Sequence, residues 1–309
     1  QVHPLVRNDH IHNRLTHSLE VSCVGRSLGL GVGDALRQRG DLPEGCTPDH
    51  LGQIIQAACL AHDIGNPPFG HAGEEAIRDW FKDSANKEQY FKNLLPAEWA
   101  DFTAFDGNAQ GFRVINALEN NKDRGGFRLT FPVIAALVKY PRSAYEAQGV
   151  GKSKFNFYTA ERGLFAEIFG AMGLAEGAGW RRHPLSYLLE AADDICYRII
   201  DMEDARELRI ITYADFKAAM TPLLDENCLD DPRLDSMDSD RRRTSMLRTT
   251  AMGRMIPSIT QTFMDNYEAI MEGRLEGCLL NHAREDVAGF MREAGRVFNS
   301  KIMNNPQKT

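Results

Sequence analysis

A histidine followed directly by an aspartate, His62-Asp63, ends a strongly helical stretch of this 309-residue chain. His62 comes eleven residues after Leu51, close to three helical turns, and so extends the apolar stripe that begins there. Asp63 comes four residues after Cys59 and borders the same stripe. A carboxylate at the buried end of a helix needs a partner, because burying it unpaired is strongly unfavourable. A divalent cation is one such partner. A core histidine beside a helix-capping aspartate is the other interpretation that this pair allows.

Two further stretches add candidate metal ligands. His17 lies in the segment NRLTHSLEV, near the start of the first predicted helix. The segment HPLSYLLEAADDICYRIIDMED carries Asp193, Tyr197 and Asp201 at four-residue steps, which places them on one helical face. Asp193 adjoins the apolar stripe and should point inward, although a solvated acidic face is the alternative. Three helices can therefore supply four ligands to one divalent ion, namely His17, His62, Asp63 and Asp193.

A candidate acid/base pair follows in the segment IGNPPFGHAGEEAI. Pro67-Pro68 stiffens the exit from the preceding helix, and Gly70 allows a tight turn. His71 then begins the next helix, with Glu74 three residues on. A carboxylate at that spacing can fix the tautomer of an imidazole and raise its basicity, which suits general acid/base catalysis. The alternative is a histidine at a helix N-terminus, with Glu74 serving only the helix dipole.

Five segments, in this order, resemble those of the deoxyguanosine triphosphate triphosphohydrolases, a family of HD-domain phosphohydrolases. The segments are HNRLTHSLEV, AHDIGNPPFGHAGE, FDGNAQGFRV, VKYPR and RHPLSYLLEAADDICYRIIDMED. The resemblance runs from residue 1 to about residue 210 and is weaker beyond. It implies an all-α fold, a multi-helix HD-domain core with additional helices packed on it.

The resemblance implies metal-dependent hydrolysis of dGTP, and of other deoxynucleoside triphosphates, to deoxynucleoside and inorganic triphosphate. His71, supported by Glu74, would be the catalytic acid/base. Asn66 stands where many HD phosphohydrolases have a further histidine, which favours one metal ion, although its amide oxygen leaves a two-metal site open. Mg, Mn, Fe, Co, Ni and Zn all remain candidates. The implied metal ligands are the four already identified, His17, His62, Asp63 and Asp193.

The same resemblance assigns residues to the substrate. Tyr197 would pack on the deoxyribose and leave no room for a ribose 2′-hydroxyl group. Asp201 and Asn108 would lie near the sugar and the phosphates, and Gln1 would contact the 3′-hydroxyl group. A triphosphate carries several negative charges, and cationic side chains suit it. The implied phosphate contacts are Arg14, Lys139, Tyr140 and Lys154. The resemblance also suggests a homo-oligomer.

Helical periodicity dominates the chain, and the alternating pattern of strands is scarce. We expect residues 1–210 to form an HD-type metal-dependent phosphohydrolase core. Residues 211–309 would be a helical extension of the same domain, with a flexible connection near 225–250, where Asp, Ser and Arg are abundant. The pattern predicts helices that begin near residues 15 and 51 and others over 72–81, 110–121, 160–172, 185–205, 212–224, 252–272 and 283–303.

Composition excludes several classes of protein. Lys and Arg number 36 and Asp and Glu 43, and this net charge of −7 argues against a general nucleic-acid coat protein. The six cysteines form no CxxC pair, which is typical of reduced thiols in a cytoplasmic protein. No run approaches the ~18 apolar residues of a membrane helix, so we expect no membrane association. Because the chain begins inside a recognisable motif, we expect it to be a portion of a longer enzyme.

Three other functions stay open at this stage. One is an HD-type nucleotidase or phosphodiesterase with another substrate. A second is a catalytically silent nucleotide-binding sensor. The third is binding of single-stranded DNA as a regulator at the basic cluster Arg241–Arg243, for which the neighbouring Asp238 and Asp240 make a solvated loop the alternative.

Overall fold

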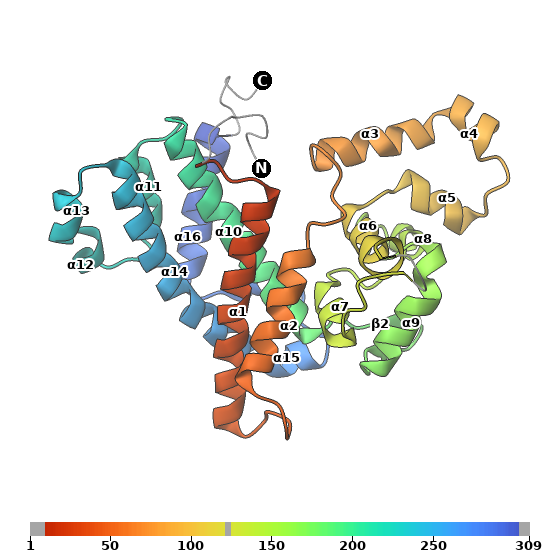
Figure 1. Cartoon of the computed structure of the whole chain (residues 1–309), viewed down its shortest axis with the longest axis horizontal. Helices are drawn as coiled ribbons and strands as arrows, with labels where there is room; N and C mark the ends of the chain where they lie inside the picture. Colours follow the sequence, from red (N-terminus) through yellow and green to blue (C-terminus); the bar gives the residue numbers. More distant parts are fainter. Residues whose placement is uncertain (1–9, 121–124, 303–309) are drawn as a thin grey trace. The chain divides into compact units, whose positions relative to one another are not determined.

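The computed structural model describes residues 10–120 and 125–302 and is built almost entirely of helices (Figure 1). Its one described sheet is a pair of two-residue antiparallel strands, β1 (Ala175–Glu176) and β2 (Gly179–Trp180). The predicted all-α class is therefore confirmed. The α-helices and the short 3₁₀ and π segments (η) are, in chain order, α1 (Arg14–Arg39), α2 (Pro48–Ala61), α3 (His71–Lys82), α4 (Ser84–Tyr90), α5 (Pro96–Thr103), α6 (Gly107–Arg113), η1 (Val114–Leu118), α7 (Phe131–Leu137), α8 (Ala144–Gly149), η2 (Thr159–Glu161), α9 (Arg162–Ala171), α10 (Pro184–Glu207), α11 (Tyr213–Met220), α12 (Glu226–Leu229), α13 (Pro232–Ser236), α14 (Asp240–Asp265), α15 (Tyr267–Met271), η3 (Leu279–His282), α16 (Glu285–Val297) and η4 (Phe298–Ile302).

The chain divides into two compact units. Unit 1 comprises residues 1–56, 190–270 and 274–309, and unit 2 comprises residues 57–189 and 271–273. Two of the boundaries fall inside α2 and α10. The boundary that we predict at residue 210 stays a prediction. None of the helices in the described ranges is long and apolar enough to cross a membrane.

In unit 1 the long helix α1 packs along α14 and against the first turns of α2 (Figure 1). Small residues permit the second contact: a Cβ on Gly29 would lie 2.8 Å from the Cα of Gly52. Asn13 begins α1, because its side chain accepts the backbone N–H of Thr16, whose hydroxyl accepts the N–H of Asn13 in return. Gly40 ends α1 in the left-handed region, at a φ of 79°.

Unit 2 is built around aromatic side chains. The rings of Phe157, Phe165 and Phe169 form a stack with centroids 4.1 Å apart, fully buried together with Phe112. This cluster joins α6, α7 and α9. Burying such large apolar groups is the main stabilising contribution to a core of this kind.

The helices differ from the predicted ranges in several places. The range 252–272, for example, holds the second half of α14 and all of α15. The range 110–121 holds the end of α6 and the π-helical turn η1. The range 225–250, predicted as a flexible connection, holds α12, α13 and the first turns of α14. Its polar side chains are helix caps, since Asp225, Asp231 and Ser239 each accept a backbone N–H at a helix start. The flexibility of the segment stays a prediction.

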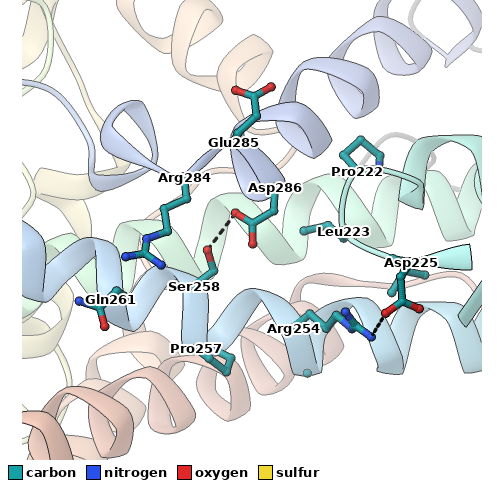
Figure 2. Close-up of a pocket in the computed structure, with 12 residues that line it drawn as sticks. Pro222, Leu223, Asp225, Arg254, Pro257, Ser258, Gln261, Arg284, Glu285 and Asp286 are labelled. Atoms are coloured by element: carbon teal, nitrogen blue, oxygen red, sulfur yellow. Dashed lines mark hydrogen bonds and ion pairs between the residues drawn. The ribbon is translucent and has the colours of Figure 1, made fainter. Parts of the chain in front are cut away.

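An open groove of about 960 Å³ lies in unit 1 between α14, the start of α16 and the segment after α11 (Figure 2). Ser258 donates a hydrogen bond to Asp286 across it, and Arg254 pairs with Asp225 at 2.7 Å. None of the site residues predicted from the sequence lines this groove.

Candidate metal and substrate site

Unit 1 contributes one pair of the predicted ligands. His17 lies in the first turn of α1, where its backbone N–H bonds to the carbonyl of Asn13 at 2.9 Å. Its Nε2 lies 3.0 Å from Oδ1 of Asp193 on α10. Both side chains are partly buried, at 17% and 34% exposure. The structure therefore brings together the imidazole and the carboxylate that the sequence predicts to share an ion.

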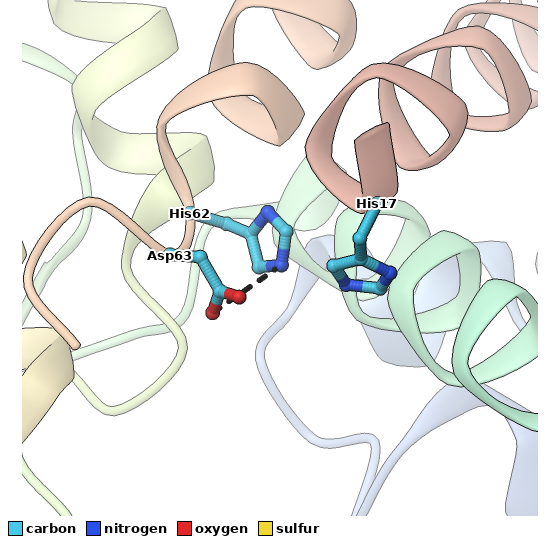
Figure 3. Close-up of side chains that lie close together, drawn as sticks. All are labelled: His17, His62 and Asp63. Carbon is cyan, nitrogen blue, oxygen red and sulfur yellow. Dashed lines mark ion pairs between the residues drawn. The ribbon is translucent and has the colours of Figure 1, made fainter. Parts of the chain in front are cut away.

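Unit 2 contributes the second pair, which follows the last turn of α2. His62 Nδ1 lies 2.7 Å from the carbonyl oxygen of Cys59. A carbonyl only accepts, so Nδ1 carries the proton and Nε2 carries the lone pair. That Nε2 lies 3.5 Å from Oδ1 of Asp63. Figure 3 draws this contact together with His17, the other histidine of the predicted ligand set.

Asn66 holds the carboxylate of Asp63. Its side-chain nitrogen donates to Asp63 Oδ1 at 2.5 Å. Its amide oxygen lies on the side of Gly107, where an added Cβ would come within 2.1 Å of it. Such a hydrogen bond orients a ligating carboxylate from outside the coordination shell. Asn66 is thus suited to positioning Asp63 more than to holding a second metal ion.

The two pairs have the spacing of metal ligands. Two atoms that each lie about 2.1 Å from one ion are roughly 3.0 Å apart at a right angle and roughly 3.4 Å apart at a tetrahedral angle. The observed separations are 3.0 Å for His17 and Asp193 and 3.5 Å for His62 and Asp63. A set of two imidazoles and two carboxylates suits a divalent transition metal or Mg²⁺. The residues present therefore fit the implied metal ion.

A strained turn leads from this site into α3. Phe69 and Gly70 have φ angles of 65° and 56°, and the first is unusual for a residue with a side chain. The turn places His71 at the first residue of α3, where it is exposed. Backbone strain of this kind is concentrated at functional sites.

Glu74 is the most enclosed of the predicted catalytic residues, with 3% exposure. One of its oxygens accepts the backbone N–H of Gly107 at 2.8 Å, and the other accepts from Arg78 at 2.9 Å and lies 3.6 Å from Nζ of Lys154. Among the described residues, these contacts hold Glu74 to α6 and to the Lys154 loop, and none of them is with His71. The support of His71 by Glu74 stays a prediction.

Two glycine-rich motifs meet backbone to backbone in unit 2. A Cβ added to Gly65 would lie 2.0 Å from the backbone nitrogen of Gly111, so only glycine fits between the turn after Asp63 and helix α6. The spacing of residues along the chain does not predict this contact. The signal was present, because GNPPFG and DGNAQG are both glycine-rich, but the residues lie too far apart along the chain to be paired by spacing.

The predicted phosphate contacts of unit 2 follow α7 and α8. Besides Glu74, Lys154 pairs with the fully buried Asp106 at 3.2 Å. Asp106 also caps α6 and accepts a hydrogen bond from the side chain of Asn108. Lys139 lies over the ring of Tyr140, 5.6 Å from its centroid. These residues are partly exposed, apart from Asp106 and Glu74.

Unit 1 carries the predicted sugar contacts on α10. Asp201 is 6% exposed, and burial, with Asp204 nearby, raises its pKa to about 6. Burial and the neighbouring Asp201 raise the pKa of Tyr197 to about 12, and its ring lies 6.0 Å from that of Phe298. Arg14 is exposed at the start of α1. Gln1 lies outside the described residues.

The basic cluster Arg241–Arg243 lies on the first turn of α14 and not in a loop. Each arginine has an acidic partner, at 3.4 Å or less: Glu207 for Arg241, Asp238 for Arg242 and Asp240 for Arg243. The binding of single-stranded DNA here stays a prediction.

Comparison with known proteins identifies the family of the chain. Residues 14–99, which contain the His62-Asp63 pair, match the family described as the HD domain, so the chain is an HD-domain protein. A Pseudomonas aeruginosa protein named deoxyguanosinetriphosphate triphosphohydrolase-like protein is 44% identical over the whole chain and 70% of its own length. A Synechocystis protein of the same name is 40% identical over 92% of the chain and 66% of its own length.

A Serratia proteamaculans protein named deoxyguanosinetriphosphate triphosphohydrolase is 32% identical over 91% of the chain and 63% of its own length. The chain belongs to the deoxyguanosine triphosphate triphosphohydrolase family of the HD superfamily. It is accordingly a phosphohydrolase.

Proposed function

We propose that this protein hydrolyses dGTP, together with other deoxynucleoside triphosphates, to deoxynucleoside and inorganic triphosphate, and that it needs one divalent metal ion. The observation that carries the proposal is the pairing of the four predicted ligands at ligand-to-ligand spacing, His17 with Asp193 and His62 with Asp63. The names of the family members support the choice of substrate.

The proposed metal ligands are His17, His62, Asp63 and Asp193. When bound, a divalent ion supplies a Lewis acid that polarises a phosphate oxygen and lowers the pKa of water. Two of these ligands are oriented by neighbouring residues. The carbonyl of Cys59 fixes the tautomer of His62, and the side chain of Asn66 fixes the carboxylate of Asp63.

The proposed reaction is attack of water on the α-phosphorus. The bond from water oxygen to phosphorus forms, and the bond from phosphorus to the 5′ oxygen of the nucleoside breaks. The nucleoside leaves with a proton on that oxygen, and the water oxygen stays on the triphosphate. His71, exposed at the start of α3, is proposed to accept the proton of the water or to donate one to the leaving oxygen.

The remaining residues are proposed to hold the substrate. The triphosphate would meet the cationic or hydroxyl groups of Arg14, Lys139, Tyr140 and Lys154. The ammonium group of Lys154 is already positioned by Asp106 and Glu74, so little side-chain freedom is lost when an anion binds. Tyr197 would pack on the deoxyribose, with Asp201 and Asn108 near the sugar and the phosphates, and Gln1 would contact the 3′-hydroxyl group.

A turnover assay tests the proposal. Purified protein is incubated with each of the four dNTPs and four NTPs, with nucleoside monophosphates or with a phosphodiester. Each incubation contains Mg²⁺, Mn²⁺, Fe²⁺, Co²⁺, Ni²⁺ or Zn²⁺, and a chelator is added to the control. We expect turnover of dGTP that the chelator abolishes, and no turnover of GTP. Hydrolysis of nucleoside monophosphates or of phosphodiesters in place of dNTPs would identify another HD-type hydrolase. Tight binding of dGTP without turnover under every metal would identify a sensor.

A further inference from the structure

A network of ion pairs in unit 1 joins three helices beside the proposed ligands His17 and Asp193. His12, in the segment before α1, lies between two carboxylates. Its Nδ1 is 2.8 Å from Asp204 on α10, and its Nε2 is 3.3 Å from Glu20 on α1. Because both ring nitrogens face acceptors, both carry protons and the ring is an imidazolium cation. The hydrogen bonds that the ring donates to Asp204 and Glu20 raise the pKa of His12 to about 10.

The backbone of His12 strengthens the same link, since its N–H group donates to the carboxylate of Asp204 at 3.2 Å. Arg248 on α14 completes the network. Its guanidinium group lies 3.2 Å from Glu20 and 2.9 Å from Glu203. Two cations and three carboxylates, at side-chain exposures between 9% and 29%, thus tie α1, α10 and α14 together.

The network and the proposed ligands share two helices. His17 lies three residues before Glu20 on α1. Asp193 lies eleven residues before Asp204 on α10, which is close to three turns and so the same face. The separation of His17 and Asp193 therefore depends on how α1 crosses α10. Both His12 and Arg248 bridge these two helices, and His12 does so from the segment that leads into the first turn of α1.

Half-buried ion pairs add little net stability, because removing the charges from water offsets most of their attraction. What they supply best is registry between elements. We propose that His12 is a positioning residue, which sets α1 against α10 so that His17 and Asp193 face each other at the spacing of two ligands of one ion. This inference rests on the proposed metal site.

The test measures Mn²⁺ affinity by equilibrium dialysis at 20 °C. His12→Gln removes the cation, and we expect it to weaken Mn²⁺ binding at least tenfold. His12→Arg keeps a cation with donors toward both carboxylates, and we expect it to restore the affinity to within threefold of the wild-type value. Asp204→Asn removes the partner on α10 and should weaken binding like His12→Gln. Arg254→Gln is the control, because it breaks an ion pair elsewhere on α14 (Figure 2).

Each outcome discriminates. Weakened binding in His12→Gln, with recovery in His12→Arg and no change in Arg254→Gln, supports the positioning role. Wild-type affinity in both His12→Gln and Asp204→Asn overturns it and leaves the proposed function intact. Equal weakening in His12→Gln and His12→Arg, with folding intact by circular dichroism, also overturns it. A wild-type protein that binds none of the divalent ions overturns the proposed metal site itself.

Discussion

The Nδ1 proton of His62 is held by the carbonyl of Cys59, three residues earlier in the same helical turn. This local hydrogen bond decides which ring nitrogen can bind a metal, and the helix supplies it before any partner arrives. In the following turn, the side chain of Asn66 donates a hydrogen bond that orients the carboxylate of Asp63. The chemistry of this pair is therefore encoded within a handful of consecutive residues.

The double substitution His62→Ala and Asp63→Ala tests this pair. We expect it to abolish bound metal, since two of the four proposed ligands are lost, and to reduce dGTP turnover to background. Metal content after dialysis, measured by mass spectrometry, checks the first result. His50→Gln is the matched control, because His50 lies on the first turn of the same helix and has no proposed role. Retained metal in the double variant would contradict the site assignment.

Helical spacing predicted that His62, Asp63 and Asp193 lie on or beside apolar stripes, and together with His17 they stay the proposed ligands. His17 with Asp193 and His62 with Asp63 are found together. The partners of Glu74 were not predictable in this way. Arg78 lies on its own helix, but the N–H of Gly107 and the ammonium group of Lys154 reach it only through tertiary packing.

At the scale of elements, the turn after Asp63 and helix α6 are in direct backbone contact through Gly65 and Gly111. This contact explains why two glycine-rich motifs, remote in the sequence, are needed together. It also ties the carboxylate of Asp63 to the N-terminus of α6, where Gly107 binds Glu74. The proposed ligand Asp63 and the buried Glu74 of α3 therefore both depend on the packing of α6 in unit 2.

Gly65→Ala should be strongly disruptive. A Cβ 2.0 Å from a backbone nitrogen forces the backbone apart, and we expect a loss of about 2 kcal/mol or more in the free energy of unfolding. Urea unfolding measures the loss, and Mn²⁺ affinity should fall with it. Gly163→Ala on α9 is the control, because a Cβ there meets nothing within 4 Å, and it should change stability by less than about 0.5 kcal/mol. A neutral Gly65→Ala would refute the close contact.

The link between α1 and α10 should make stability depend on pH. The pKa of His12 is raised to about 10 by Asp204 and Glu20, from about 6.5 in an unfolded chain. A raised pKa means that the stabilisation is complete below about pH 6.5 and is lost as the pH rises to 10. We expect wild type to exceed His12→Gln by on the order of 1–2 kcal/mol at pH 6, with the gap closing near pH 10 and above. Urea unfolding of both proteins across this pH range measures the difference. A difference in the free energy of unfolding that does not change with pH would contradict the imidazolium bridge.

Helix caps explain why composition did not predict the helices of the segment 225–250. Asp and Ser in the segment 225–250 are residues of loops and of helix N-caps alike. Here Asp225, Asp231 and Ser239 cap successive helices. Helices as short as α12 and α13 show no apolar periodicity. Whether an Asp or Ser in this segment lies in a loop or caps a helix therefore depends on tertiary contacts, which composition does not predict.

At the scale of the whole molecule, the net charge of −7 is a poor guide to the charge of the substrate. Many arginines form ion pairs with acidic side chains, as the cluster Arg241–Arg243 illustrates. Lys154 is also paired, with Asp106 and Glu74, yet it stays one-third exposed. An anionic substrate would meet such local cations together with a metal ion, and the total charge has little bearing on that encounter.

The most direct test of the proposed function is the position of ¹⁸O after hydrolysis of dGTP in H₂¹⁸O with Mn²⁺. Mass spectrometry of the products identifies the bond that breaks. We predict deoxyguanosine without label and one ¹⁸O in inorganic triphosphate, because water attacks the α-phosphorus and the 5′ oxygen leaves with the nucleoside. Deoxyguanosine monophosphate with pyrophosphate, or label in the 5′-hydroxyl group of deoxyguanosine, would contradict the proposed reaction.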